Sequence, residues 1–79
     1  MPSVSFPFDA QLVSVRREVC PHARWDRVRR VWTMTPVEAQ AFLAAGQARL
    51  DYCRTTARIA IDKELWLVGF AEGAPIRQA

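Results

Sequence analysis

The chain has little of several residue types on which enzymes and extracellular scaffolds depend. Its 79 residues include only three glycines, two cysteines and one histidine. Gly46, Gly69 and Gly73 fit neither the spacing of a phosphate-binding loop nor that of a dinucleotide fold. With His22 as the only histidine, directly after Pro21, a serine or cysteine triad lacks its base. We therefore expect no nucleotide cofactor and no catalytic activity.

The two cysteines exclude a disulfide scaffold and leave two smaller alternatives. Cys20 and Cys53 are expected to be reduced, small apolar residues in a cytoplasmic protein, and a bridge between them is the first alternative. A zinc site that adds His22 is the second, but the paired C-x-x-C spacing and a fourth ligand are missing. The sequence therefore predicts no metal site.

Long apolar runs are also missing. The longest uninterrupted ones span only a few residues, such as residues 65–68, whereas a membrane span needs roughly 20. Residues 1–6 lack a positively charged segment followed by a long apolar one, as a signal peptide would have. We therefore expect a cytoplasmic protein that is not exported. A hydrophobic fraction of 51% in 79 residues predicts one domain, residues 1–79, with residues 73–79 as a loose tail.

Arginine, in contrast, is abundant in the first half of the chain. Ten of the eleven basic residues are arginine, and residues 16–30 hold six of them against two carboxylates, a local charge of +4. The guanidinium fork suits phosphate and carboxylate, so this stretch predicts docking on a protein–RNA complex, a nucleic acid or an acidic protein surface. A merely solvated face is the alternative. The candidate contact residues are Arg16, Arg17, Arg24, Arg27, Arg29 and Arg30.

The residue patterns of the first half predict a strand, a helix and a hairpin. Residues 4–8 alternate and contain Pro7, as in a short edge strand. Asp9 is the expected N-cap of a helix over residues 10–20, on which Arg16 and Arg17 fall away from the apolar side. Residues 23–34 are typical of two strands joined by a polar turn.

The second half opens with a capping box, in which Thr35 is the N-cap and Glu38 its partner, with Pro36 at the first helical position. This helix is predicted to end near residue 51. Two strands, residues 56–61 and 65–70, follow around a turn, and residues 71–75 have loop composition. The fold class is α+β, in the order β-α-β-β-α-β-β, with an antiparallel sheet carrying two helices. The predicted apolar stripe of the helix comprises Val37, Ala41, Phe42, Ala45, Ala48 and Tyr52.

The three tryptophans each allow two interpretations. Trp25 and Trp32 flank the charged turn; the preferred interpretation places them in the core, and the other lets them stack on bases. Trp66 alternates with two leucines in the last hairpin. If the second helix covers the leucines, Trp66, Val68 and Phe70 form an exposed stripe for a protein partner or a second copy of the chain. Otherwise these residues lie on one face of a covered sheet.

Two resemblances add to this pattern. The Ala-Arg-Trp-Asp stretch at residues 23–26, the Arg-Val-Trp-Thr stretch at residues 30–33 and the alanine-rich helix after them resemble a small module of bacterial mobile-element proteins. That module is similar to the HARP domain of annealing helicases, and the likeness covers roughly residues 4–45. It implies a Trp-bearing hairpin that helps to recognise forked DNA, with Arg24, Arg29 and Arg30 as contacts.

As a type, a non-catalytic α+β domain of this size also resembles the small anti-CRISPR proteins of phages and other mobile elements. Such proteins dock on an RNA-guided effector complex and block target DNA, guide RNA or nuclease recruitment. This resemblance implies a non-enzymatic inhibitor whose partner is a protein–RNA complex, and it is the leading functional expectation. An accessory nucleic-acid-binding module is the second expectation, and a generic protein–protein adaptor is the third.

Overall fold

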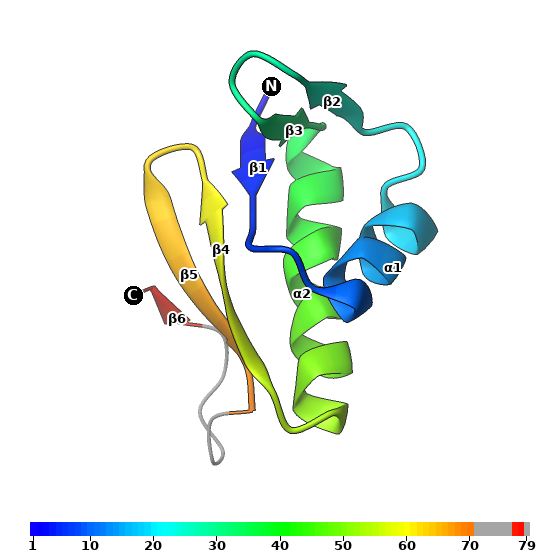
Figure 1. Ribbon diagram of the computed structural model, residues 1–79, viewed down its shortest axis with the longest axis vertical. Coiled ribbons are helices and arrows are strands. Elements are labelled where there is room, and N and C mark those ends of the chain that lie inside the picture. Colours follow the sequence, from blue (N-terminus) through cyan, green and yellow to red (C-terminus); the bar gives the residue numbers. More distant parts are fainter. Residues whose placement is uncertain (71–76, 79) are drawn as a thin grey trace.

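The computed structural model describes residues 1–70, 77 and 78, and its elements follow one another in the predicted α+β order (Figure 1). The sequence prediction is confirmed for the first seven elements. The predicted loop at residues 71–75 lies outside the described residues. The elements are β1 (Ser3–Ser5), α1 (Ala10–Val19), β2 (Arg24–Asp26), β3 (Val31–Thr33), α2 (Pro36–Tyr52), β4 (Thr56–Ile61), β5 (Glu64–Gly69) and β6 (Arg77–Gln78).

Both helices begin where their capping residues predict. The Asp9 carboxylate accepts hydrogen bonds from the backbone N–H groups of Gln11 (2.8 Å) and Leu12 (3.2 Å) at the start of α1. At the start of α2, the Thr35 hydroxyl accepts from the Glu38 N–H (3.1 Å) and the Glu38 carboxylate accepts from the Thr35 N–H (2.9 Å). These bonds satisfy N–H groups that have no partner within the helix.

The six strands form one antiparallel sheet in the order β2-β3-β1-β4-β5-β6. The first strand, β1, is present at its predicted place in the element order, but it covers Ser3–Ser5 instead of residues 4–8, and it lies between β3 and β4 instead of at an edge of the sheet. Pro7 lies beyond the paired residues, so its missing N–H interrupts no ladder. The turn between β4 and β5 secures β1, because Asp62 donates its N–H to the Ser3 carbonyl (2.8 Å) and accepts the Ser3 N–H on its carboxylate (3.0 Å).

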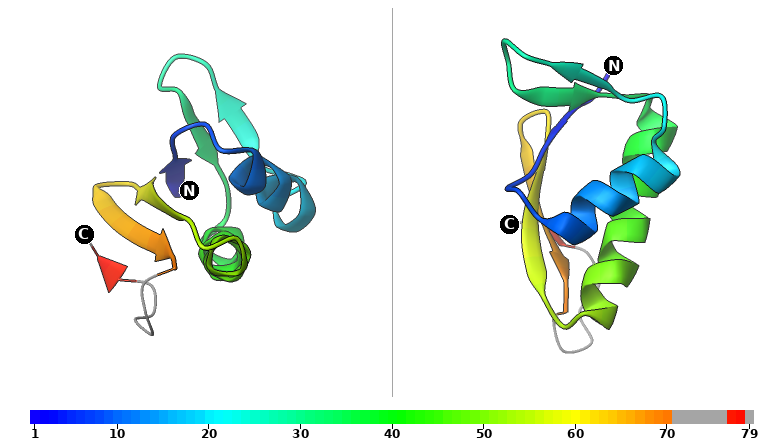
Figure 2. Two further views of the ribbon diagram at one scale, coloured as in Figure 1. Left: turned by 60° about the horizontal axis from the view of Figure 1, so that its bottom comes forward. Right: turned by 45° about the vertical axis from the view of Figure 1, so that its right-hand side comes forward.

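The helix α2 packs against β4 and β5, and α1 packs on α2 at the same side of the sheet (Figure 2). The helices approach closely at Gly46, where an added Cβ would lie 3.3 Å from Leu12 Cδ2. Inward residues of the strands complete the core on this side. The buried apolar residues are Val4, Leu12, Val15, Cys20, Met34, Ala39, Phe42, Leu43, Leu50, Ile59 and Val68.

The predicted apolar stripe of α2 is confirmed at Phe42, which is buried, and at Ala45, which packs against the core, and it is wrong at its other residues. Val37 and Tyr52 are 79% and 86% exposed, and the helix turns a neighbouring side inward. The observed inner residues also follow helical spacing. They include two leucines, Leu43 and Leu50, which bury more apolar surface than the alanines of the predicted stripe would. The inner residues are Ala39, Phe42, Leu43, Gly46 and Leu50.

The end of the chain adds a strand that the sequence does not predict. Residues 73–79 are expected as a loose tail, but β6 pairs with β5, with Gln78 opposite Trp66 and Arg77 opposite Leu67. The other residues of the expected tail lie outside the described part of the chain. In the part of the chain that the structure describes, no helix is long and apolar enough to cross a bilayer.

Candidate functional site

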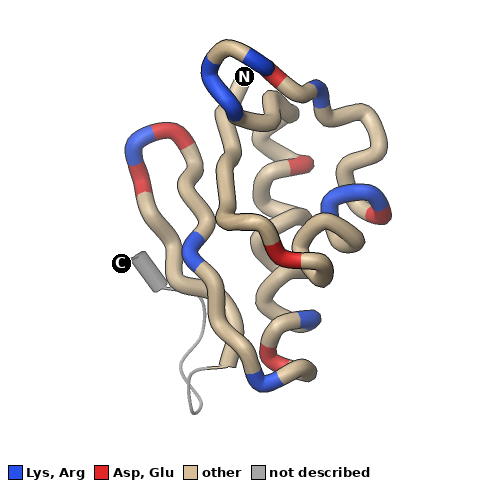
Figure 3. Tube along the Cα trace, in the orientation of Figure 1, with Lys and Arg blue, Asp and Glu red and all other residues tan. Residues whose placement is uncertain are grey.

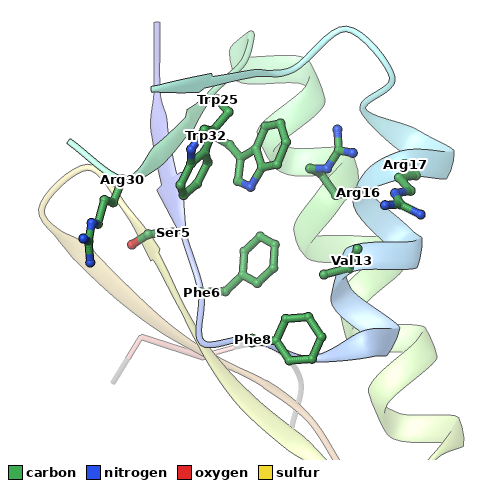
Figure 4. A pocket seen from close by; sticks show the side chains of 9 residues that line it. All are labelled: Ser5, Phe6, Phe8, Val13, Arg16, Arg17, Trp25, Arg30 and Trp32. Carbon is green, nitrogen blue, oxygen red and sulfur yellow. The ribbon is translucent and has the colours of Figure 1, made fainter. Parts of the chain in front are cut away.

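A groove opens between α1, the segment that follows β1 and the β2–β3 hairpin (Figure 4). Its volume is about 530 Å³, within the range of small-molecule sites. Aromatic rings and arginines make up most of its surface. We call it the aromatic groove, and it is lined by Ser5, Phe6, Phe8, Val13, Arg16, Arg17, Trp25, Arg30 and Trp32.

Two tryptophans from neighbouring strands form one wall of the groove. Trp25 and Trp32 are cross-strand partners, and their ring centroids lie 5.2 Å apart at an interplanar angle of 57°. Trp32 is opposite the buried Val4 on β1, so both rings lie on the side of the sheet that carries the helices. Trp32 packs against the core, while Trp25 remains 49% exposed. The core interpretation therefore describes Trp32 and only partly describes Trp25.

Arg16 reaches from α1 onto this pair. Its guanidinium carbon lies 3.9 Å from the centroid of the Trp32 ring, a cation–π contact, and its Nη1 donates to the Cys20 carbonyl at 3.3 Å. The sequence pattern predicts Arg16 and Arg17 on the outer side of the helix, but both line the groove. The long side chains extend past the apolar side of α1 and place their charges at its edge.

The hairpin loop places Arg30 at the groove and displays its neighbours to solvent. The Asp26 carboxylate accepts the N–H groups of Val28 and Arg29, both at 3.0 Å, and the Arg30 N–H donates to the Asp26 carbonyl. Arg30 has a φ of 57°, a left-handed conformation that costs a side chain roughly 1–2 kcal/mol. Arg27 and Arg29 are exposed at the tip. Aspartate thus shapes the loop in the absence of glycine.

The basic end of the molecule is not neutralised by its own carboxylates. Among the described residues, the one ion pair within 4.0 Å joins Arg49 to Glu18 (3.2 Å), and it includes none of the six arginines at residues 16–30. Blue segments gather at the β2–β3 hairpin and the end of α1 in Figure 3. Since no carboxylate among the described residues pairs with these charges, they are available to an anion.

The structure brings together only part of the predicted contact set. Arg16, Arg17 and Arg30 meet at the aromatic groove. Arg24 precedes Trp25 on β2 and so lies on the opposite face of the sheet, and Arg27 and Arg29 extend the positive surface beyond the groove. Whether these side chains contact a partner stays a prediction.

The exposed stripe predicted around Trp66 does not form. Val68 is 1% exposed, and Trp66 packs against the core from the same side of β5, because α2 covers this face. Leu65, on the other face, is 38% exposed. The stripe is expected only if the second helix covers the leucines. The helix instead covers the face that carries Trp66 and Val68.

Sequence reasoning missed the part of the groove contributed by the segment between β1 and α1. Phe6 stacks on the buried Phe42 with ring centroids 5.2 Å apart, whereas Phe8 is 88% exposed. Their signal in the sequence is a pair of phenylalanines around Pro7, directly before the Asp9 cap. Because the alternating pattern assigns these residues to a strand, it gives no indication of a groove.

The cysteines and the histidine lie apart from this chemistry. Both cysteines are free; Cys20 is buried and Cys53 exposed. Burial, and next the nearby Glu38 carboxylate, raise the pKa of the Cys20 thiol, which keeps it protonated at neutral pH, and a protonated thiol is a poor nucleophile. Within the described residues, no three His, Cys, Asp or Glu side chains gather to hold a metal ion. A zinc site of the two cysteines and His22 is therefore not assembled there.

Comparison with protein-family models, with curated proteins and with solved structures finds no match to this chain. The aromatic groove and its charges therefore carry the functional argument.

Proposed function

We propose that this protein is a non-catalytic nucleic-acid-binding module that acts in the cytoplasm. The observation that carries the proposal is the convergence of Trp25 and Trp32 with Arg16, Arg17 and Arg30 in one groove. Aromatic faces stack on bases of any sequence, and unpaired guanidinium groups bind phosphate through paired N–H donors. The resemblance of residues 4–45 to a DNA-recognition module supports the same function.

The hairpin tip enlarges this surface beyond the groove. Arg27 and Arg29 are exposed there, and Asp26 uses its carboxylate on the loop backbone. Phosphate contacts from such a tip increase affinity without reading sequence. We therefore expect binding with little sequence preference and a strong dependence on salt.

The test is a titration of a labelled single-stranded oligonucleotide of about 12 nucleotides at several salt concentrations. The wild-type protein should bind, and each phosphate contact should contribute about −0.7 to the slope of log K against log salt. Replacing Arg27, Arg29 and Arg30 together by glutamate should make this slope shallower by about 2, because roughly three contacts are lost.

A matched control carries the same change in charge away from the groove. Arg54, Arg58 and Lys63 are exposed on the other half of the molecule, and their replacement by glutamate reverses three charges as well. This control should retain most of the slope. Equal losses in both variants would mean that net charge alone governs binding, and no binding by the wild type would refute the proposal.

A second function is favoured by one further observation. Val28 is 93% exposed at the hairpin tip, between Arg27 and Arg29. An apolar side chain among exposed arginines is suited to a protein surface, which agrees with the expected inhibitor of an RNA-guided effector complex. That inhibitor would bind purified effector complex tightly and free nucleic acid weakly. A pull-down with such complexes, repeated with Val28→Asp, separates it from the first function.

A further inference from the structure

The two tryptophans of the groove differ in the ring surface that they leave free. Trp32 has the Arg16 guanidinium over its ring and Trp25 tilted against it, so it is largely occupied within the protein. Trp25 is 49% exposed, and Phe8, which lines another part of the groove, is 88% exposed. Free aromatic surface in the groove is therefore concentrated on Trp25 and Phe8.

The charges are arranged on both sides of these rings. Figure 4 shows Arg30 on one side and Arg16 and Arg17 on the other, with the aromatic side chains between them. A nucleic-acid strand that crosses the groove would place one phosphate near Arg30 and another near α1, with the intervening base facing the rings. A duplex cannot do this, because its base faces are already stacked on their neighbours.

We propose that the aromatic groove holds a single unpaired nucleobase, stacked on Trp25, while the phosphates on either side of it lie at Arg30 and at Arg16 and Arg17. The inference rests on the proposed function and specifies its substrate class, a strand with at least one unpaired base. Besides its place at the phosphate, the Arg16 side chain contacts the Trp32 ring and donates to the Cys20 carbonyl, and these contacts hold the wall of the groove in place.

The test compares three DNA duplexes of identical sequence: one fully paired, one with a single bulged adenosine, and one with an abasic residue in place of that adenosine. Base stacking on an aromatic side chain is worth roughly a 5- to 150-fold change in affinity. The bulged duplex should bind tighter than the paired one by a factor in this range. The abasic bulge keeps the charge and the bend, and it should return the affinity to that of the paired duplex.

Trp25→Leu provides the matching protein variant. It should abolish the preference for the bulged duplex, so that the variant binds the bulged and the paired duplex with equal affinity through the remaining phosphate contacts. Trp25→Phe should restore part of the preference. Trp66→Leu is the control, since it makes the same substitution at a partly buried tryptophan outside the groove. Thermal melting establishes that each variant is folded.

The outcomes separate this inference from the proposed function. Equal, salt-sensitive affinity for all three duplexes overturns the inference and leaves nucleic-acid binding intact, whereas no binding to any of them overturns both. Adenosine monophosphate, used as a competitor, should be at least roughly 100-fold weaker than the bulged duplex, because it offers only one phosphate. Competition at equal concentration would assign the groove to a free nucleotide and contradict the inference.

Discussion

The two ends of the sheet differ in whether their polar and aromatic side chains find partners within the fold. In the half formed by β4, β5 and α2, polar groups find partners within the fold: the Gln47 side chain donates to the Gly69 carbonyl (2.9 Å) and accepts the Gly69 N–H (2.7 Å). In the half formed by β2 and β3, Trp25 is half exposed, and none of its arginines forms an ion pair with a described carboxylate. The first half therefore stabilises the domain, whereas the second leaves aromatic and cationic side chains free for the proposed binding.

The largest effect is expected at Gly69 in the stabilising half. Gly69 has a φ of 113°, and an added Cβ would collide with the Thr55 carbonyl oxygen. Gly69→Ala should therefore lower the free energy of unfolding by about 3 kcal/mol or more, measured by urea denaturation. Gly46→Ala meets only the ends of the Leu12 and Ile59 side chains and should cost less. Similar losses for both would contradict the strain argued for Gly69.

Trp25 and Trp32, which are cross-strand partners, should differ in their contribution to stability. Trp32 packs against the core, so Trp32→Ala should cost about 3 kcal/mol of stability. Trp25 is 49% exposed, and Trp25→Ala should cost about 1 kcal/mol. Thermal melting of both variants under the same conditions measures the difference. If Trp25→Ala destabilises as much as Trp32→Ala, Trp25 is a structural residue, and the β2–β3 half does not keep it free for binding.

The capping box of α2 predicts a smaller, pH-dependent effect. Thr35→Ala should cost about 1 kcal/mol at neutral pH. Hydrogen bonds from the Thr35 backbone N–H, and secondly from its hydroxyl, lower the pKa of Glu38 below its ordinary 4.5. The ionised carboxylate thus stabilises the fold above pH 4.5, and this contribution is lost as the pH falls through the lowered pKa. Glu38→Gln should therefore melt below wild type at pH 7, with a gap that narrows in acid.

A constant gap between wild type and Glu38→Gln from pH 7 to acid would contradict the linkage to this carboxylate. The same melting curves serve for Thr35→Ala, which removes the hydroxyl that accepts the Glu38 N–H. Neither Thr35 nor Glu38 lines the aromatic groove, so neither variant should change affinity for nucleic acid.

The smallest effect is expected at Arg30. Arg30→Gly removes the cost of a left-handed side chain and should raise the free energy of unfolding by up to about 1 kcal/mol. It should also weaken binding, since one arginine of the groove is lost. Thermal melting and a binding titration on the same preparation measure both quantities. Stabilisation without any loss of affinity would remove Arg30 from the binding surface.

Local signals predict the element order and both helix starts, because caps and short hydrophobic periods depend on neighbouring residues. They do not predict the central position of β1, which depends on pairing with two strands far along the chain. The sequence misassigns the buried face of α2 because alanine is found both in cores and on surfaces. The many alanines therefore do not decide which of two neighbouring faces, both containing Phe42, is buried. The arginines are found by charge alone, whereas Phe6 and Phe8 join them only through the tertiary fold.

The most direct test of the division between the two halves follows the indole N–H resonances of the three tryptophans by NMR during titration with the bulged duplex. Trp25 and Trp32 line the aromatic groove, and Trp66 packs against the core in the other half. If the groove binds the unpaired base, the Trp25 and Trp32 resonances should shift in a saturable way, with the larger shift at Trp25, while the Trp66 resonance stays in place. A shift confined to Trp66, or equal shifts of all three, would contradict binding at the groove.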